Sequence, residues 1–184
     1  MADPLLTAAE FSAGTGGKIA ADDPRVQKLL DGATRAIRRY CGWHVAPVLT
    51  ETVKLDGPGG SLLRLPTLRL VDITVLKEGG VDQDVESLEW SEKGMIRRRH
   101  GCWTDRFRGI EATIEHGFED ADDVKQIIQQ VVANAISSPL GATSEAAGAL
   151  SVSWATTAPG VSGGLSLLER DLAVLELYRL EKAA

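Results

Sequence analysis

Two short cysteine–histidine pairs are the residues of this sequence that could bind a metal ion. Cys41 and His44 are separated by two residues, and His100 and Cys102 are separated by one. Thiolate sulfur and imidazole nitrogen are ligands that zinc prefers, and four of them complete a tetrahedral site. The two pairs are separated by a long segment, and short pairs of this kind often occur without a metal. We therefore expect no metal and no cofactor, and keep these four residues as the alternative.

The sequence contains no recognisable catalytic motif. A cysteine nucleophile could be combined with any of the three histidines, but no predicted strand–turn–helix elbow surrounds any serine. The glycine-rich segments 57–60 and 163–164 lack the Gly-Lys-Ser/Thr of a phosphate-binding loop. Asp122 and Asp123 suit the start of a helix, where negative charge is favourable. We expect no catalytic residues and no enzymatic activity.

A basic segment is the clearest candidate for contact with a partner. Residues 93–108 contain six basic residues and one acidic residue, a net charge of +5. Because the whole chain has a formal net charge of −6, the remaining residues carry −11. Such a segment suits contacts with phosphates or with an acidic neighbouring subunit, and it is equally typical of an exposed hairpin with solvated side chains. The expected contact residues are Arg97, Arg98, Arg99, Arg106 and Arg108.

Length and composition limit the classes of protein that fit. A chain of 184 residues, with 43% hydrophobic and 25% charged residues, suits an ordinary globular protein. A pI near 5.1 argues against a dedicated DNA-binding protein. The longest uncharged run, residues 146–168, is too rich in Gly, Ser and Thr to cross a membrane. Two cysteines and the lack of a readable signal peptide predict synthesis in a reducing cytoplasm.

A helical period marks the core of the protein. Asp23 is a suitable N-cap, Pro24 suits the first helical position, and Gly42 suits the end of the same helix. Thr7 and Glu10 fit a capping box at the start of a short turn. Apolar residues that recur at helical spacing predict core helices over residues 24–41, 121–138 and 166–181.

Between the first two helices the apolar residues recur with a period of two. Short apolar runs separated by glycine-rich turns favour an antiparallel sheet over parallel βαβ units. Strands are expected over residues 48–55, 61–65, 68–76, 85–90, 94–99 and 109–115. The predicted fold class is α+β: a helical bundle core with an inserted antiparallel β-rich lobe and a flexible Gly/Ser/Ala-rich linker before the C-terminal helix.

The linker contains one apolar alternation of its own. Leu150, Val152 and Trp154 alternate with small residues, which predicts a short strand. Because long loops in compact domains are uncommon, we expect this strand to contact a partner by adding to the sheet edge of a neighbouring subunit. The expected organisation is an N-terminal segment with the first core helix at 1–46, the β-rich lobe at 47–118, the second core helix at 119–138, the linker at 139–165 and the C-terminal helix at 166–184.

A series of short motifs runs in one order along residues 24–180. It begins at Arg38-Arg-Tyr-Cys-Gly-Trp-His-Val-Ala-Pro and continues through Leu65-Pro, Leu70-Val-Asp-Ile-Thr-Val-Leu, Leu88-Glu-Trp, Lys93-Gly-Met-Ile-Arg, Gly101-Cys-Trp, Ile114-Glu-His-Gly-Phe and Leu150-Ser-Val-Ser-Trp to Leu165-Ser-Leu-Leu-Glu-Arg-Asp. This order resembles the head-to-tail adaptor (head–tail connector) proteins of tailed bacteriophages, particularly those of actinobacterial hosts.

The resemblance implies a structural protein of the virion neck, made in the host cytoplasm. It implies a homo-oligomeric ring, commonly of twelve subunits, that binds the portal protein and a stopper or tail-completion protein. Genomic DNA would pass through the channel without sequence-specific binding, and no membrane is involved. Family members often contact the portal through the C-terminal segment, which here implies Leu167, Leu168, Leu172, Leu175, Tyr178 and Arg179. The alternatives are a stopper or tail-terminator ring protein, and a zinc-dependent enzyme or regulator built on the cysteine–histidine set.

Overall fold

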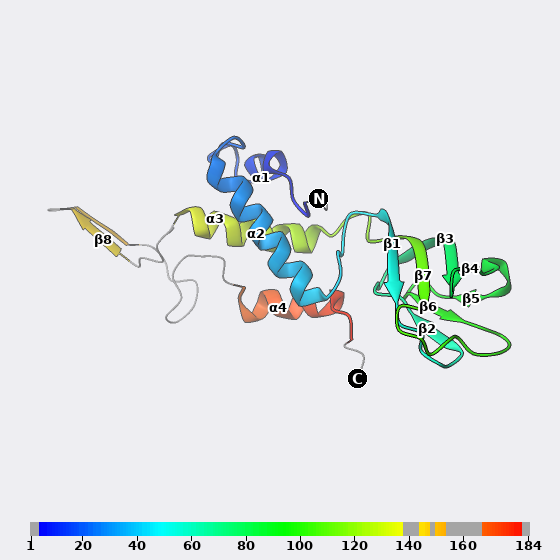
Figure 1. Ribbon diagram of the computed structural model, residues 1–184. Coiled ribbons are helices and arrows are strands. Elements are labelled where there is room, and N and C mark those ends of the chain that lie inside the picture. The colour runs from blue at the N-terminus through cyan, green and yellow to red at the C-terminus, as the bar shows by residue number, and fades with distance from the viewer. Residues whose placement is uncertain (1–3, 138–143, 148–149, 154–166, 182–184) are drawn as a thin grey trace. The chain divides into compact units, whose positions relative to one another are not determined.

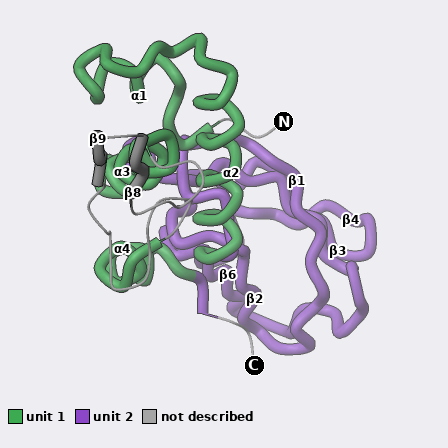
Figure 2. Tube along the Cα trace, turned by 90° about the vertical axis from the view of Figure 1, so that its left-hand side faces the viewer, with its two compact units in different colours: residues 1–41, 122–179 green, residues 42–121, 180–184 purple. Residues whose placement is uncertain are grey.

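The structure is a computed structural model that describes residues 4–137, 144–147, 150–153 and 167–181 (Figure 1). Helices and antiparallel sheets give the α+β fold with an inserted β lobe that the sequence predicts. The chain divides into two compact units (Figure 2). The helical unit takes its described residues from 1–41 and 122–179, and the β unit takes them from 42–121 and 180–184.

The helical unit is built around one long helix. Its elements are α1 (Ala8–Gly14), α2 (Pro24–Cys41), α3 (Asp122–Ser137), α4 (Glu169–Leu175) and a 3-10 turn, η2 (Glu176–Tyr178). Helix α2 packs against α1, α3 and α4. The interior between these helices is apolar, and its fully buried side chains include Phe11, Leu30, Ile37, Ile128 and Leu175.

Local signals account for the bounds of α2, which agree with the prediction. The Asp23 carboxylate accepts a hydrogen bond from the backbone N–H of Arg25 at 2.9 Å, which satisfies a donor in the first turn. Gly42 has a φ of +84°, the left-handed conformation that commonly ends a helix. Helix α1 begins with the predicted capping box of Thr7 and Glu10, and it extends beyond the expected turn to Gly14 because Phe11 is buried in the core.

The β unit contains two antiparallel sheets. Its strands are β1 (Leu49–Leu55), β2 (Leu62–Arg64), β3 (Leu70–Glu78), β4 (Val81–Asp82), β5 (Glu89–Trp90), β6 (Met95–Arg97) and β7 (Ile110–His116). The four-stranded sheet has the order β1-β7-β3-β4, and the three-stranded sheet has the order β2-β6-β5. Both share one apolar core, whose buried members include Leu63, Leu76, Ile96, Trp103 and Ile114.

Strand β7 and its two neighbours set the register of the larger sheet (Figure 1). Every second residue of β7 is buried, and the last of these buried residues is His116, so a histidine occupies the final position on the apolar face of the strand. Leu49 of β1 pairs with His116. The two ends of the unit also meet, since Phe118 N–H donates to the carbonyl oxygen of Val45 at 2.9 Å.

Several predicted elements are shorter than expected, and for two of them the structure shows a local reason. The strand predicted over 85–90 is a strand only at β5, because the Asp84 carboxylate accepts from the Glu86 N–H and turns Val85–Ser87 into a 3-10 helix, η1. The last helix was expected over 166–181. It begins at Glu169, where the Asp171 carboxylate accepts from the Leu168 N–H, and gives way to the 3-10 turn after Leu175.

The linker contains a pair of strands. Strand β8 (Ser144–Ala147) pairs antiparallel with β9 (Leu150–Ser153), so the predicted linker strand begins where expected. Trp154 lies outside the described residues. Within the part of the chain that the structure describes, no helix is long and apolar enough to span a membrane.

Candidate functional site

The basic segment lies mostly in the connection between β6 and β7, and this connection is held firmly. Backbone N–H groups of Arg98 and Trp103 donate to the carbonyl oxygens of Ser61 and Gly60 at 3.0 and 2.8 Å. Gly57 packs so closely that a Cβ there would lie 2.0 Å from the carbonyl oxygen of Thr104. The loop is therefore a fixed surface rather than a loose hairpin.

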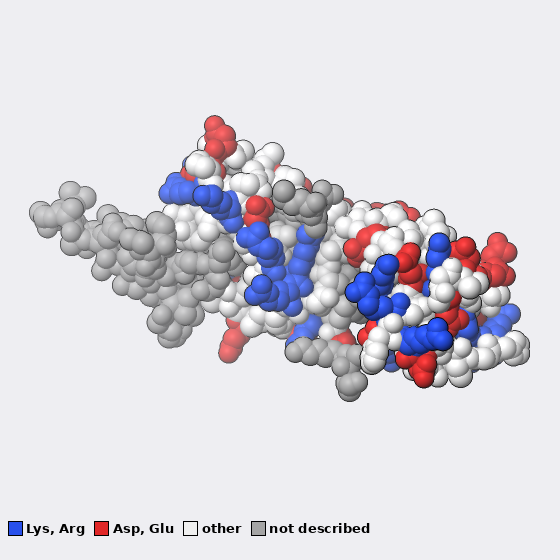
Figure 3. Space-filling view, viewed as in Figure 1, with Lys and Arg blue, Asp and Glu red and all other residues white. Residues whose placement is uncertain are grey.

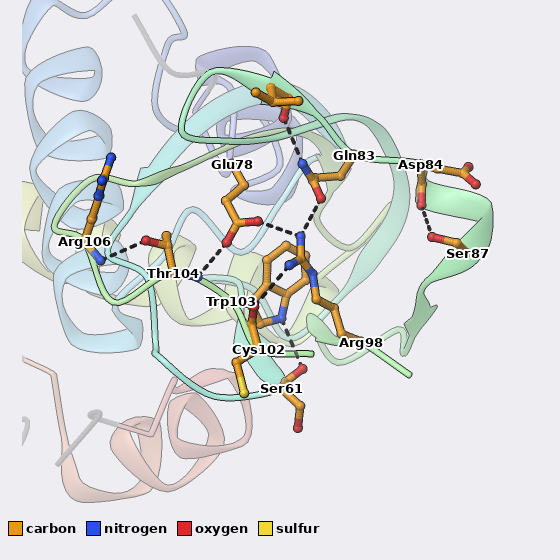
Figure 4. A network of polar contacts seen from close by, with 11 residues as sticks. Ser61, Glu78, Gln83, Asp84, Ser87, Arg98, Cys102, Trp103, Thr104 and Arg106 are labelled. Atoms are coloured by element: carbon orange, nitrogen blue, oxygen red, sulfur yellow. Dashed lines mark hydrogen bonds and ion pairs between the residues drawn. The ribbon is translucent and has the colours of Figure 1, made fainter. Parts of the chain in front are cut away.

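Arg98 is the residue that anchors this loop to the sheet (Figure 4). Its guanidinium lies 3.9 Å from the centre of the Trp103 ring, a cation–π contact, and 2.7 Å from the Glu78 carboxylate. It also donates to Gln83 and to the carbonyl oxygen of Cys102. The Arg98 and Glu78 side chains are 17% and 19% exposed, so both charges are largely shielded from water. The positive charge of Arg98 therefore pairs with Glu78 of the same chain.

The other arginines of the segment face solvent. Arg97 is exposed, and Arg99 forms an exposed ion pair with Glu89 at 3.1 Å. Arg106 and Arg108 flank Phe107, which is 87% exposed. We call these last three residues the Arg–Phe–Arg tip.

The backbone of the Arg–Phe–Arg tip is fixed although its side chains are free of the core. Arg108 has a φ of +52°, and its N–H donates to the Asp56 carboxylate at 2.7 Å. Gly57 N–H donates to the carbonyl oxygen of Arg106 at 2.9 Å. Because this backbone is already fixed, binding at the tip orders less of the chain, and the two arginines beside the exposed Phe107 ring favour an acidic partner surface. The charge pattern of the sequence indicates the arginines but not Phe107.

A second basic surface lies on the helical unit. Helix α2 exposes Arg25, Lys28, Arg35 and Arg39. Figure 3 shows lysine and arginine side chains gathered along this helix on the face in view. Charge counting along the sequence does not reveal this surface, because apolar core residues separate its members.

The structure does not assemble the cysteine–histidine set. Cys41 is buried in the helical unit, where its thiol lies 3.9 Å from the carbonyl oxygen of Leu175 and burial raises the thiol pKa to about 11. His100 and Cys102 are exposed in the loop after β6. Among the described residues, the group of potential metal ligands consists instead of His44, Glu51 and His116.

This His–Glu–His cluster (His44, Glu51 and His116) lies at one end of the larger sheet. One ligand atom from each residue falls within 4.8 Å of the other two. His116 Nε2 lies 2.8 Å from a Glu51 carboxylate oxygen, and the centroids of the His44 and His116 rings are 4.3 Å apart. Burial lowers the pKa of His116, and Glu51 partly opposes that shift, so the neutral ring is favoured. The Trp43 ring stacks on His116, and Phe118 packs against Trp43 in turn.

One signal in the sequence pointed to this cluster. Ile110, Ala112 and Ile114 alternate along the buried face of β7, and His116 takes the next position on that face. Glu51 likewise lies among the apolar residues of β1, directly opposite Ile114. Polar residues at two adjacent apolar positions of paired strands indicate a specific contact between them.

The predicted portal-contact residues contribute to the packing of their own unit. Leu175 is fully buried, and the Tyr178 hydroxyl donates to the Asp123 carboxylate at 2.8 Å. Arg179 pairs with Glu176 at 3.1 Å and lies over the Tyr40 ring. The remaining predicted residues, Leu167, Leu168 and Leu172, are half-buried. Leu177, which is not among the predicted contacts, is a large apolar residue of this segment that is exposed, at 77%.

No protein-family model matches this chain, and no curated protein matches it. Solved structures do. A chain in the neck of a native GTA particle computed with C12 symmetry is 15% identical, with a TM-score of 0.62, over 100% of this chain and 94% of that chain. A chain in the neck of an empty GTA particle computed with C6 symmetry is also 15% identical, with a TM-score of 0.63, over 100% and 95%.

A third structure, the virion of a native gene transfer agent (GTA) particle, contains a chain that is 17% identical, with a TM-score of 0.63, over 100% of this chain and 95% of that chain. At these identities the likeness establishes a shared fold. It extends over both units, so the β-rich insertion and the helices around it occur together in those particle proteins.

Proposed function

We propose that this chain is a structural virion protein, a head-to-tail adaptor that forms a ring in the neck of a phage-type particle. The observation that carries the proposal is the likeness of fold, over the whole chain, to chains of GTA necks with twelvefold and sixfold symmetry. The order of motifs along residues 24–180 supports the same role independently of the fold. Twelve subunits fit the higher of the two symmetries, and no catalysis is needed.

We propose that the Arg–Phe–Arg tip contacts the neighbouring subunit of the ring. The tip offers an exposed aromatic ring between two cations, and the chain outside residues 93–108 carries a net charge of −11. Complementary charge on one chain suits a repeated head-to-tail contact, because each subunit supplies both surfaces. Arg97 and Arg99 extend the basic surface of the same segment.

The portal contact is assigned to the C-terminal segment. Leu177 is exposed at 77%, and Leu167, Leu168 and Leu172 are only half-buried, so this segment retains apolar surface for a partner. Genomic DNA would pass through the ring without sequence-specific contacts. An acidic channel would keep DNA mobile, because phosphate groups find few cations to hold them.

Assembly with purified partners tests this role. Native mass spectrometry and negative-stain images of the protein, alone and mixed with portal, should show a ring or a ring-on-portal complex. We expect Phe107→Ser to weaken subunit assembly and Leu177→Ser to weaken portal binding, so each variant is the control for the other. Binding to a tail component but not to portal would favour a stopper or tail-terminator ring. Failure to bind any portal or tail component would overturn the proposal.

A further inference from the structure

The His–Glu–His cluster is placed by the register of two paired strands. Leu49 on β1 pairs with His116 on β7, so Glu51 lies diagonally opposite His116 on the same face of the sheet. His44 approaches from the segment before β1. The approach is close because Gly117 has no side chain: a Cβ there would lie 2.6 Å from His44 Nε2 and 2.5 Å from the carbonyl oxygen of Pro47.

Hydrogen bonds determine which nitrogen of each ring carries the proton. His44 Nε2 lies 2.8 Å from the carbonyl oxygen of Pro47, and a carbonyl oxygen only accepts, so Nε2 carries the hydrogen and the lone pair lies on Nδ1. In neutral His116 the same reasoning applies, since Nε2 lies 2.8 Å from the Glu51 carboxylate. Among the described residues, nothing forms a hydrogen bond to the buried Nδ1 of His116. That is the metal-free arrangement; a zinc ion beside Glu51 would be bound by His116 Nε2, the nitrogen that faces the carboxylate, and the ring proton would then lie on Nδ1.

We propose that His44, His116 and Glu51 form a binding site for a divalent zinc ion. Their ligand atoms lie within 4.8 Å of one another, and bonds of about 2.0–2.1 Å in a tetrahedral site require separations of about 3.4 Å. Glu51 is 46% exposed, so its side chain has room to adjust towards an ion. Solvent reaches the site on the Glu51 side, which leaves room for a water molecule as the fourth ligand.

The donor set selects the class of metal. Two imidazole nitrogens and one carboxylate oxygen suit zinc and its neighbours among the transition metals, whereas magnesium and calcium prefer oxygen ligands throughout. The site contains no thiolate, which separates it from the cysteine–histidine set considered in the sequence. The proposal concerns the β unit alone and holds whether or not the chain forms a neck ring.

The test is zinc binding by the full-length protein after treatment with a chelator. Titration of Zn²⁺, followed by isothermal calorimetry, should show one ion per chain. Cobalt(II) substitution should give visible bands of a site with fewer than six ligands and no intense thiolate band in the near ultraviolet. Glu51→Gln keeps a hydrogen-bond acceptor for His116, and we expect it to weaken zinc binding by at least ~10-fold.

His44→Asn provides a second variant, because His44 is only half-buried, and it should reduce zinc affinity more than Glu51→Gln. The matched control combines His100→Ala with Cys102→Ser, both at exposed positions of the same unit, and should bind zinc like the unaltered protein. Circular dichroism confirms that each variant folds. Binding that is absent in the unaltered protein, that survives Glu51→Gln unchanged, or that is lost in the His100/Cys102 variant would overturn the proposal.

Discussion

Arg98 and Arg106 belong to the same loop and carry the same charge, but the structure gives them different roles. Arg98 contacts Trp103, Glu78 and Gln83 within its own unit. Arg106 extends into solvent beside Phe107. The charge of the loop is therefore divided between a residue that maintains its shape and residues that are available to a partner.

This division can be measured by replacing each arginine with alanine. Arg98→Ala should lower the free energy of unfolding by about 2–4 kcal/mol, because it removes the cation–π contact and leaves Glu78 without its cation. Arg106→Ala should change it by less than about 0.5 kcal/mol, as is usual for exposed residues. Urea unfolding of both variants gives the comparison. Equal losses would contradict the assignment of Arg98 to the interior.

Sequence patterns could identify the basic segment but could not tell which of its arginines is largely buried and which are exposed. Arg97, Arg98 and Arg99 are consecutive, and nothing local tells which one will meet Trp103 and Glu78, because Glu78 comes from a distant strand. His116 is a different case. Its position after Ile110, Ala112 and Ile114 placed it on the buried face of β7, so its burial could have been predicted from periodicity alone.

At the level of elements, the attachment of the C-terminal turn depends on two tyrosines. The Tyr178 hydroxyl donates to Asp123 at the start of α3, and the Tyr40 hydroxyl donates to Glu176 at 2.6 Å. Both bonds require a protonated phenol. The segment that we assign to the portal is thus held to its own helices by groups that lose their protons only in alkali.

The Tyr178 contact predicts a loss of stability at high pH. Burial, followed by the hydrogen bond to Asp123, raises the pKa of Tyr178 to about 12 from its ordinary value of 10.0. A raised pKa means that the contribution is complete below pH 10 and disappears as the pH rises towards 12. Tyr178→Phe should cost about 1–2 kcal/mol at pH 8 and should make the decline of stability between pH 10 and 12 shallower. Urea unfolding across that range measures both effects, and an unchanged slope would contradict the role of Tyr178.

A matched pair of glycines tests the turns of the β unit. Gly94 has a φ of +73°, and a Cβ there would lie 2.7 Å from the carbonyl oxygen of Thr67. Gly80 has a φ of +86° with open space around it. Gly80→Ala should cost about 1–2 kcal/mol from the backbone alone, whereas Gly94→Ala adds a clash and should cost about 3 kcal/mol or more. Thermal unfolding distinguishes them, and equal costs would show that the close approach at Gly94 is easily relieved.

Periodicity and end signals predicted the long elements well and the short ones poorly. Helix α2 has its N-cap, its apolar stripe and its terminal glycine in the sequence, so its bounds could be read directly. The end of the last helix could not be predicted in this way, because it depends on the contact between Tyr178 and Asp123, which are far apart along the chain. Strand β5 is short for a local reason, the Asp84 cap, which competes with the apolar pattern of residues 85–90.

For the whole chain, the net charge of −6 conceals two separate basic surfaces, one on α2 and one at the Arg–Phe–Arg tip. If the tip contacts an acidic neighbouring subunit, assembly should respond to ionic strength. Raising salt from about 0.05 to about 0.5 M should weaken subunit association, because it screens charges at exposed contacts.

Substitution of the tip residues provides the control for this salt effect. Arg106→Ala combined with Arg108→Ala should assemble less well at low salt and should respond less to added salt than the unaltered protein. Sedimentation velocity at several salt concentrations measures both quantities. An equal salt response in the two proteins would assign the charge dependence to another surface, with α2 the first to examine.

The hydrogen bond between Phe118 and Val45 joins the point where the chain enters the β unit to the point where it leaves. Because the two ends of this insertion lie side by side, the helical unit needs to supply only two neighbouring points of attachment for it. Evolution could therefore exchange this unit as a cassette, lengthening or replacing its loops while the helices keep their packing. Such interchangeability would let one helical scaffold meet a succession of different neighbours.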